Sequence, residues 1–306
     1  APGWRRLPRA AWLGALASRA GTALTVGAGR LYRGTGLARL AAWGGIHRWP
    51  SLAALHRLAI QCERLPRLPA SPPAGPASGD RYGLFLGCIA RAAQPGAIEA
   101  SLRVMRSLGL PIEVPDVQTC CGALHRHNGL PEGADQRLRR NAAAFAGLTA
   151  VGLASACVAE LRGHPPLGAT QDLCRFLADR DWPATVRLAP LPQAVAVHVP
   201  CSQRNRLGDE DAAFALLRRI PGITLVELPD NPFCCGAAGT YLLQRPALSR
   251  ALLAPKIASL AALRTSILVT TNTGCALHLA AGAREAGLRV EVLHPVELID
   301  RQMRFT

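Results

Sequence analysis

The sequence predicts an α/β protein made of two tandem cysteine-rich domains, each with a small parallel sheet flanked by helices, related by pseudo-twofold symmetry and preceded by a basic helical region. Three observations predict it. A pair of adjacent cysteines followed by glycine occurs twice. Each pair is bracketed by one further cysteine on either side. Short apolar strands alternate with helical segments in one order in both halves, which favours parallel sheets with crossover helices.

The cysteines form two sets of four with nearly the same spacing. The first set is Cys88, then after 31 residues Cys120 and Cys121, then after 35 residues Cys157. The second set is Cys201, then after 32 residues Cys234 and Cys235, then after 39 residues Cys275. Matching cysteines are offset by 113, 114 and 118 residues, which is too long for a solenoid unit. Each copy is therefore expected to be a domain that arose by duplication.

The length of 306 residues and a hydrophobic content of 49% allow a sizeable core and suggest about two domains. We expect a basic helical region at 1–69, a linker at 70–79, a first cysteine-rich domain at 80–190 and a second at 191–306. The first region has apolar residues at helical spacing, interrupted at Gly44-Gly45 and at Pro50. The linker contains only Pro, Ala, Ser and Gly, which is typical of an extended, exposed chain.

The net charge of +15 is concentrated near the start of the chain. Residues 1–70 contain eleven arginines and a single acid, Glu63. Such a segment suits lipid headgroups, nucleic acid or an acidic partner. The aromatic content is only 5%, and no helix-turn-helix, zinc-finger or RNA-binding motif is present, so the sequence predicts no nucleic-acid partner.

Strands and helices are expected in the same order in both domains. In the first domain we expect strands at 83–88, 112–114 and 150–154, and helices at 96–108 and through Leu138 and Phe145. In the second domain we expect strands at 195–199, 223–228, 267–271 and 290–293, and helices at 212–220, 248–263 and from Pro295. Every cysteine position of the two sets follows the end of a strand. Because ligands gather at the carboxyl ends of parallel strands, four sulfurs that are remote in sequence are expected to converge at one rim.

Four thiolates are soft ligands that select zinc or an iron–sulfur cluster. Adjacent cysteines favour a cluster, because neighbouring thiolates can ligate different irons, whereas a zinc ion is more often held by C-x2-C pairs, which this sequence lacks. Gly122 and Gly236 let the backbone approach a bulky centre and supply amide donors. The alternative is that cysteines pack as small hydrophobic residues. We expect this of Cys62 and Cys174, which fall outside both sets.

Four stretches support a resemblance to a known family. They are Thr119-Cys-Cys-Gly-Ala-Leu-His125, Phe233-Cys-Cys-Gly-Ala-Ala-Gly-Thr-Tyr241, Thr271-Asn-Thr-Gly-Cys275 and His294-Pro-Val-Glu-Leu298. From about Arg81 to the end, the sequence resembles the tandem CCG-domain family. This family includes the CCG-domain subunit of heterodisulfide reductase and the iron–sulfur subunits of glycolate, lactate and anaerobic glycerol-3-phosphate dehydrogenases. Within it, the sequence is most similar to the glycolate oxidase iron–sulfur subunit.

The resemblance implies electron transfer by a chain that performs no substrate chemistry of its own. A flavoprotein dehydrogenase subunit would oxidise a 2-hydroxy acid and pass electrons through one or two 4Fe-4S clusters, cubane or noncubane, towards a membrane quinone. The location would be cytoplasmic, with peripheral contact at the inner face of the cytoplasmic membrane left open. The implied ligands are the first set, Cys88, Cys120, Cys121 and Cys157, and the second set, Cys201, Cys234, Cys235 and Cys275.

The sequence departs from the family pattern in two ways. Heterodisulfide reductase ends each set with C-x2-C, and Glu160 and His278 stand at the corresponding positions here, which puts the noncubane form in doubt. Either side chain could ligate iron, but we expect an exposed glutamate and a histidine on a helix face. Glycolate oxidase subunits also carry an upstream ferredoxin-like segment with C-x2-C-x2-C-x3-C-P runs. This sequence contains none, and whether such a segment or subunit precedes Ala1 stays open.

Other interpretations also stay open. The histidines near the cysteines, His125, His127 and His198, could hydrogen-bond to sulfur and tune a potential, or lie at helix surfaces and turns. Instead of electron transfer, the chain could reduce thiols or disulfides as heterodisulfide reductase does. It could also be a zinc-bound or metal-free scaffold that keeps the fold as a binding module.

Overall fold

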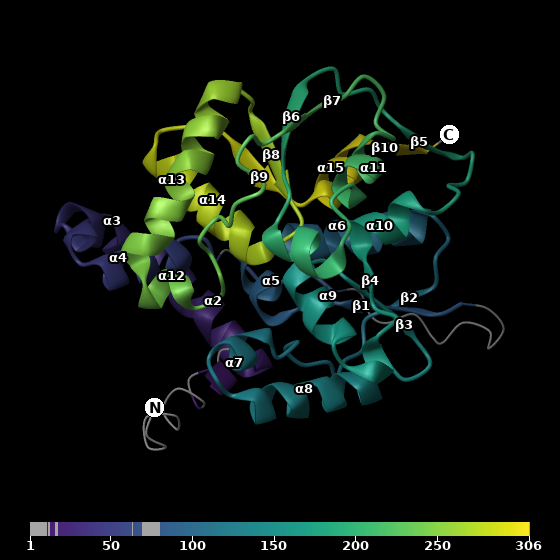
Figure 1. Cartoon of the computed structure of the whole chain (residues 1–306), viewed down its shortest axis with the longest axis horizontal. Coiled ribbons are helices and arrows are strands. Elements are labelled where there is room, and N and C mark those ends of the chain that lie inside the picture. The colour runs from purple at the N-terminus through teal and green to yellow at the C-terminus, as the bar shows by residue number, and fades with distance from the viewer. Residues whose placement is uncertain (1–10, 12, 16–17, 63, 69–79, 306) are drawn as a thin grey trace.

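The computed structural model describes residues 11, 13–15, 18–62, 64–68 and 80–305. They form two four-stranded parallel sheets with helices packed against them, preceded by a group of helices (Figure 1). The mixed α/β fold class that the sequence predicts is confirmed. The predicted linker at 70–79 lies outside the described residues.

The two sheets have the same strand topology. The first has the order β2-β1-β3-β4 and the second has the order β7-β6-β8-β9, and all neighbours are parallel. The strands of the first sheet are β1 (Tyr82–Phe85), β2 (Ile112–Glu113), β3 (Thr149–Gly152) and β4 (Gln171–Asp172). Those of the second are β6 (Ala194–His198), β7 (Thr224–Glu227), β8 (Ile267–Thr270) and β9 (Glu291–Leu293). Of the strands in these two sheets, sequence patterns predicted all except β4, which is only two residues long.

The central strands are short runs that are buried along all of their length or all but their first residue. All four residues of β1 and all four of β8 are buried. Burial of both faces is expected of parallel strands, because crossover helices cover both sides of the sheet. Their hydrophobic sequences therefore place β1, β3, β6 and β8 at the middle of their sheets.

Helices follow the strands in both halves. Those after β1 and β2 are α5 (Cys88–Ala93), α6 (Pro95–Ser107), α7 (Ala123–His127) and α8 (Pro131–Ala144). After β3 and β4 come α9 (Ser155–Arg162), η3 (Pro165–Leu167) and α10 (Leu173–Ala178). The second half contains η4 (Gln203–Leu207), α11 (Ala212–Leu217), α12 (Tyr241–Gln244), α13 (Pro246–Leu263), α14 (Thr273–Glu285) and α15 (Pro295–Gln302). Proline begins α6, α8, α13 and α15, where its fixed φ suits the first helical turn and no backbone donor is lost.

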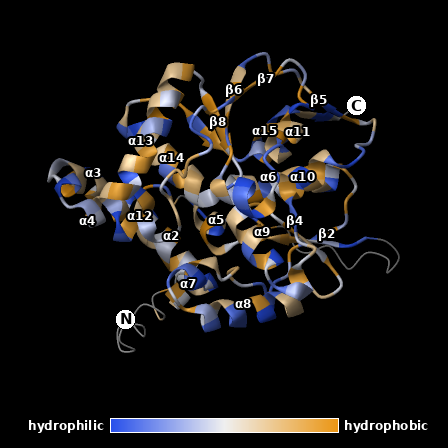
Figure 2. Cartoon of the chain, viewed as in Figure 1, coloured by the Kyte–Doolittle hydropathy of each residue, from blue (hydrophilic) through white to orange (hydrophobic). Residues whose placement is uncertain are grey.

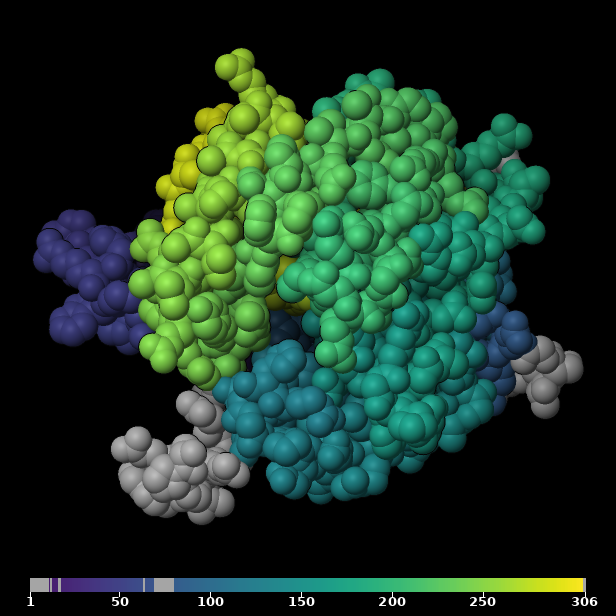
Figure 3. Space-filling view, viewed as in Figure 1, coloured from purple at the N-terminus to yellow at the C-terminus, as the bar shows by residue number. Residues whose placement is uncertain are grey.

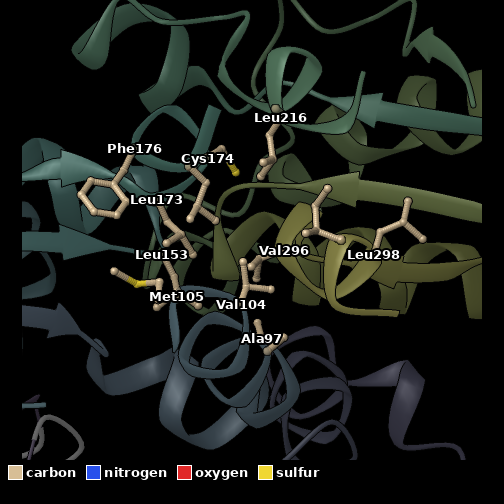
Figure 4. Close-up of a cluster of buried hydrophobic side chains, with 14 of the residues drawn as sticks. Ala97, Val104, Met105, Leu153, Leu173, Cys174, Phe176, Leu216, Val296 and Leu298 are labelled. Atoms are coloured by element: carbon tan, nitrogen blue, oxygen red, sulfur yellow. The ribbon is translucent and has the colours of Figure 1, made fainter. Parts of the chain in front are cut away.

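One continuous hydrophobic core joins the two halves. It contains side chains from α6 and α10 of the first half and from α11 and α15 of the second, including Met105, Phe176, Leu216 and Val296 (Figure 4). Cys174 lies within it and is fully buried, as predicted for a cysteine outside the two sets. The halves therefore share their largest apolar cluster rather than meeting at a polar surface.

The end of the chain crosses to the first half. Helix α15 packs against α6, where Asp300 accepts hydrogen bonds from the guanidinium of Arg103, the shortest 2.7 Å. The final strand β10 (Met303–Phe305) pairs antiparallel with β5 (Val186–Leu188). The domain boundary expected at residue 190 stays a prediction.

The N-terminal region is helical, with α2 (Arg19–Gly34), α3 (Leu37–Trp43), η2 (Ile46–Arg48) and α4 (Pro50–Ala59). The helices break at the predicted places, because α3 ends before Gly44-Gly45 and α4 begins at Pro50. Helix α2 packs against α5 of the first half, and α4 packs against α12 and α13 of the second. Within the described part of the chain, no helix combines the length and apolar character needed to cross a membrane.

Candidate metal centres

The first set of cysteines comes from the ends of three neighbouring strands. Cys88 begins α5 just after β1, Cys120 and Cys121 lie in the loop between β2 and α7, and Cys157 lies in the first turn of α9 after β3. The Sγ atoms of Cys88 and Cys120 are 3.3 Å apart. Cys121 is hydrogen-bonded to both Cys120 and Cys157. Successive contacts thus link the four sulfurs, from Cys88 to Cys120, from Cys120 to Cys121 and from Cys121 to Cys157.

The second set repeats this arrangement. Cys201 follows β6, Cys234 and Cys235 follow β7, and Cys275 lies in the first turn of α14 after β8. The Sγ atoms of Cys235 and Cys275 are 3.1 Å apart. Cys234 is hydrogen-bonded to Cys201 and Cys235. The structure therefore brings all eight sequence-predicted site residues into two groups of four.

Buried amide side chains hold each cysteine loop against the first strand of its sheet. In the first half, Gln118 accepts from the backbone N–H of Leu86 (2.9 Å) and donates to the carbonyl of Leu84 (3.1 Å). In the second half, Asn231 makes the matching bonds at 3.0 Å with the backbone of Val199 and Val197. A side chain that mimics a neighbouring strand in this way fixes the loop where the sheet itself has ended.

Glycine after each cysteine pair is required by the packing. Gly122 and Gly236 have φ values of +98° and +86°, in the left-handed region that favours glycine. A Cβ at Gly236 would lie 2.4 Å from the carbonyl oxygen of Ser249. Each glycine N–H also points at a sulfur, that of Cys120 at 3.5 Å and that of Cys234 at 3.3 Å. The amide donors thus point at cysteine sulfur, and the approach of this backbone to a bulky centre stays a prediction.

One cysteine in each set is poised to be a thiolate. Hydrogen bonds from Cys121 and Cys88 hold the pKa of Cys120 well below its ordinary value. Hydrogen bonds from Cys201 and Cys235 do the same for the pKa of Cys234. The same contacts raise the pKa of the neighbouring thiols Cys88, Cys121, Cys201 and Cys235. Each set thus offers one cysteine that favours the thiolate form, which is the form that binds metals, and the others would lose a proton on binding.

Positive charges surround the first set. A pocket of about 480 Å³ opens beside Cys88 and Cys120. Four arginines line it, together with a single acid, Asp116. These arginines are Arg19, Arg91, Arg137 and Arg140. Their charges favour the thiolate forms of the cysteines and would compensate the negative charge of a thiolate-bound centre.

The second set has a buried lysine and a buried histidine instead. Lys256 of α13 is inaccessible to solvent, and its Nζ donates to the carbonyl oxygen of Asp230 at 2.6 Å. Burial lowers the pKa of Lys256, and the nearby cysteines of the second set oppose this shift. His198, the last residue of β6, is also buried, which lowers its pKa to about 3 and keeps it neutral. Lys256 belongs to no recognisable motif, and the one sign of it in the sequence is its position between Leu253 and Leu260 on the apolar face of a helix.

Of the other candidate residues, Glu160 and His278 have partners of their own. Glu160 was expected to be exposed, and this was wrong: its side chain is 9% exposed and lies 2.6 Å from Nε of Arg126. His278 is buried on α14 and lies 3.0 Å from Oγ of Ser249. His125 is buried, whereas His127 is exposed.

The two sets face each other across the junction of the halves. Ser155, two residues before Cys157, is hydrogen-bonded through Oγ to Ser202, the neighbour of Cys201, at 2.7 Å. Asn272, three residues before Cys275, donates to the same Ser202 oxygen at 3.0 Å. Figure 3 shows that the molecular surface is hollowed near its centre, where segments of both halves meet. A short direct contact thus links residues that flank the first and second sets.

These features define a duplicated α/β protein with a four-thiol site at the strand ends of each repeat. Residues 82–159 and 195–280 match the model of the cysteine-rich CCG domain. The chain belongs to the CCG cysteine-rich domain family, which confirms the resemblance found in the sequence.

Three relatives illustrate the range of this family. One subunit of fumarate reductase (CoM/CoB) from Methanothermobacter marburgensis is 29% identical and is matched over 72% of this chain and 46% of its own length. Lactate utilization protein A from Geobacillus thermodenitrificans is 24% identical, over 72% of this chain and 99% of its own. The probable glycolate oxidase iron-sulfur subunit from Bacillus subtilis is 27% identical, over 72% and 54%. The chain thus spans about half of the first and third relatives and nearly all of the second.

Solved structures add little. An aspartate racemase homologue from Pyrococcus horikoshii aligns over 73% of this chain and 96% of its own, with 13% identity and a TM-score of 0.30. We draw nothing from a likeness of that size.

Proposed function

We propose that this chain is an iron–sulfur electron-transfer subunit of a flavin-dependent 2-hydroxy-acid dehydrogenase. The observation that carries the proposal is the meeting of eight cysteine sulfurs in two adjoining groups of four at the strand ends of two matched sheets. One relative is named as an iron-sulfur subunit of glycolate oxidase, and others are named for lactate utilization and for fumarate reduction. These names support an oxidoreductase complex of which this chain is one part.

The residues present fit an iron–sulfur cluster in each set. Each set offers four thiols, one of them poised as a thiolate, which is the donor chemistry of a 4Fe-4S cluster. Adjacent cysteines suit a polynuclear centre because each thiolate can ligate a different iron. The proposed ligands are Cys88, Cys120, Cys121 and Cys157 for one cluster and Cys201, Cys234, Cys235 and Cys275 for the other. A cluster there would accept and release single electrons.

The chain's own residues would keep the clusters close together and shield their charge. Arginines beside the first set and Lys256 beside the second provide positive charge, and Gly122 and Gly236 provide N–H donors to cysteine sulfur. The Ser155–Ser202 contact holds the two sets next to each other. Electrons that leave a flavoprotein would cross this junction from one set to the other on the way to quinone.

The chain offers a surface on which a flavoprotein partner would dock. Large apolar side chains are exposed on the N-terminal helices, with Trp43 89% and Trp49 67% exposed. The leucines beside them are Leu24, Leu31, Leu37 and Leu40. Exposed arginines, such as Arg39 and Arg48, lie among them. Orange residues mark α3 and α4 at the outer edge of the molecule in Figure 2. We call this the α2–α4 surface.

Tryptophan and arginine are the residues that contribute most to protein interfaces. The start of α2 lies beside the first set, because Arg19 and Thr22 line the same pocket as Cys88 and Cys120. A redox partner that extends from the α2–α4 surface along α2 to this end would lie close to the first cluster, and electron transfer slows steeply with distance. The arginines predict that the partner's surface is acidic.

Serine at both Trp43 and Trp49 is expected to weaken binding of the flavoprotein subunit at least about tenfold, because two apolar anchors are lost. Binding would also weaken as salt rises, since the arginines contribute by screened attraction. Isothermal titration with the flavoprotein subunit of the same organism measures both effects. Phe233→Ser is the matched control, because Phe233 is 68% exposed but lies outside the α2–α4 surface.

Two results would contradict this docking role. One is unchanged affinity in the double variant. The other is that the unmodified chain sediments with anionic phospholipid vesicles and the double variant does not. That result would assign the surface to membrane binding.

The electron-transfer role is tested by a redox titration of the anaerobically purified chain. We expect visible absorbance that bleaches on reduction with dithionite and returns on oxidation. The isolated chain should not oxidise glycolate or lactate, and should accept electrons from those acids only when the flavoprotein subunit is added. A colourless chain without a redox transition, or substrate oxidation by the chain alone, would refute the assignment.

A further inference from the structure

Among the residues that the structure describes, a histidine ring nitrogen groups with cysteine sulfurs at metal-binding range in the second set and not in the first. One ring nitrogen of His198 and the sulfurs of Cys235 and Cys275 all lie within 4.8 Å of one another, and all three residues are buried. A metal bound by sulfur at about 2.3 Å and by nitrogen at about 2.0 Å would hold those two atoms at most about 4.3 Å apart. Small side-chain rotations would therefore bring the three donors to one metal atom.

The first set has a phenylalanine in the corresponding place. His198 precedes Cys201 by three residues, and Phe85 precedes Cys88 by the same number. The strand register agrees, because His198 pairs with Thr270 on β8 just as Phe85 pairs with Gly152 on β3. The two repeats thus share one framework but differ at the position nearest to the end of their first strand.

The hydrogen-bond partner of His198 in the second repeat also has no counterpart in the first repeat. Nδ1 of His198 lies 2.9 Å from Oγ1 of Thr270, a hydroxyl for which Gly152 has no equivalent. Histidines that ligate metals are usually oriented by a hydrogen bond at the other ring nitrogen. His198 therefore has the burial and the neighbouring sulfurs of a metal ligand, and its contact with Thr270 would orient the ring for ligation through Nε2.

We propose that His198 is a nitrogen ligand of the metal centre at the second set, bound to a metal atom that Cys235 or Cys275 also holds. The centre at the first set is then ligated by sulfur alone, and the two centres differ chemically. This proposal rests on the proposed function, because it requires a metal centre at the second set. Ligand identity is one of the factors that set the reduction potential of an iron–sulfur centre, so the two centres are expected to differ in potential.

The test uses pulsed EPR on the reduced, iron-loaded full chain. To isolate the second set, Cys121→Ala is introduced, and histidine is supplied with nitrogen-15 to identify the source of any coupling. We expect a hyperfine coupling from histidine nitrogen that disappears in His198→Phe, the variant that copies the first repeat. A redox titration should show a shifted potential of the second centre in that variant, and an unchanged potential would count against ligation by His198. His278→Asn is the control, because His278 is also buried in this half but is hydrogen-bonded to Ser249. The histidine coupling seen in the unmodified second set should be unchanged in this control variant.

The outcomes separate this proposal from the proposed function. An iron-loaded second set without histidine coupling overturns the ligand assignment and leaves the electron-transfer role intact. Coupling that survives in His198→Phe does the same. A second set that binds no iron in the unmodified chain refutes both. Should His198→Phe fail to fold, His198→Cys supplies a sulfur ligand in its place, and loss of the nitrogen coupling with retained iron supports the assignment.

Discussion

Alanine at Cys121 is expected to abolish the metal centre of the first set and to leave the second intact. Cys121 is 3% exposed and joins Cys120 to Cys157 in the row of sulfur contacts, so its loss divides the set. Iron and acid-labile sulfide per chain should fall to about half of the unmodified values, because one of two 4Fe-4S clusters is lost. Metal and sulfide analysis after anaerobic purification measures the change.

Two further variants make this experiment specific. Cys235→Ala should remove the second centre in the same way, and the iron content of the double variant Cys121→Ala/Cys235→Ala should be close to zero. Cys174→Ala should keep all of its iron, because Cys174 is a buried cysteine in the hydrophobic core outside both sets. Full iron content in Cys121→Ala would show that the first set does not hold a cluster.

Alanine at Phe176 is expected to lower the free energy of unfolding by about 3–5 kcal/mol, since a large buried aromatic side chain would leave a cavity. Phe176 is 1% exposed, packs edge-on against the ring of Tyr82 with centroids 4.9 Å apart, and is covered by the guanidinium of Arg180 at 3.7 Å. It belongs to the core that both halves share. Denaturant unfolding of the full chain should therefore remain a single transition at a lower midpoint.

The control for this prediction is Phe233→Ala. Phe233 is 68% exposed, so its loss should change the free energy of unfolding by no more than about 0.5 kcal/mol. For each variant, the midpoint measured by fluorescence should agree with the midpoint measured by circular dichroism. Two separate transitions, only one of which moves in Phe176→Ala, would show that the halves unfold independently and that the shared core does not couple them.

The cysteine spacing and the alternation of apolar strands with helices were enough to predict the class of fold and the meeting of the sulfurs. This worked because parallel strands end at one rim, so any residue just past a strand end is brought to that rim. The resemblance to CCG domains followed from the same residues, and the family match confirms it.

Other features could not be read from local patterns. An apolar helix face indicates burial but not the partner against which it packs, so the contact of α15 with α6 and the pairing of β5 with β10 were not foreseen. Glu160 was expected to be exposed because nothing in the sequence shows that Arg126, 34 residues earlier, approaches it. The difference between Phe85 and His198 became meaningful only when the strand register aligned the two repeats.

The most direct test of the account is the metal content of the unmodified chain, purified without oxygen and assayed for iron, zinc and acid-labile sulfide. The account predicts about four irons and four sulfides for each filled cysteine set, or about eight of each for the whole chain, in a brown protein. About one zinc per set without sulfide, as expected for mononuclear thiolate sites, or no metal at all would contradict it.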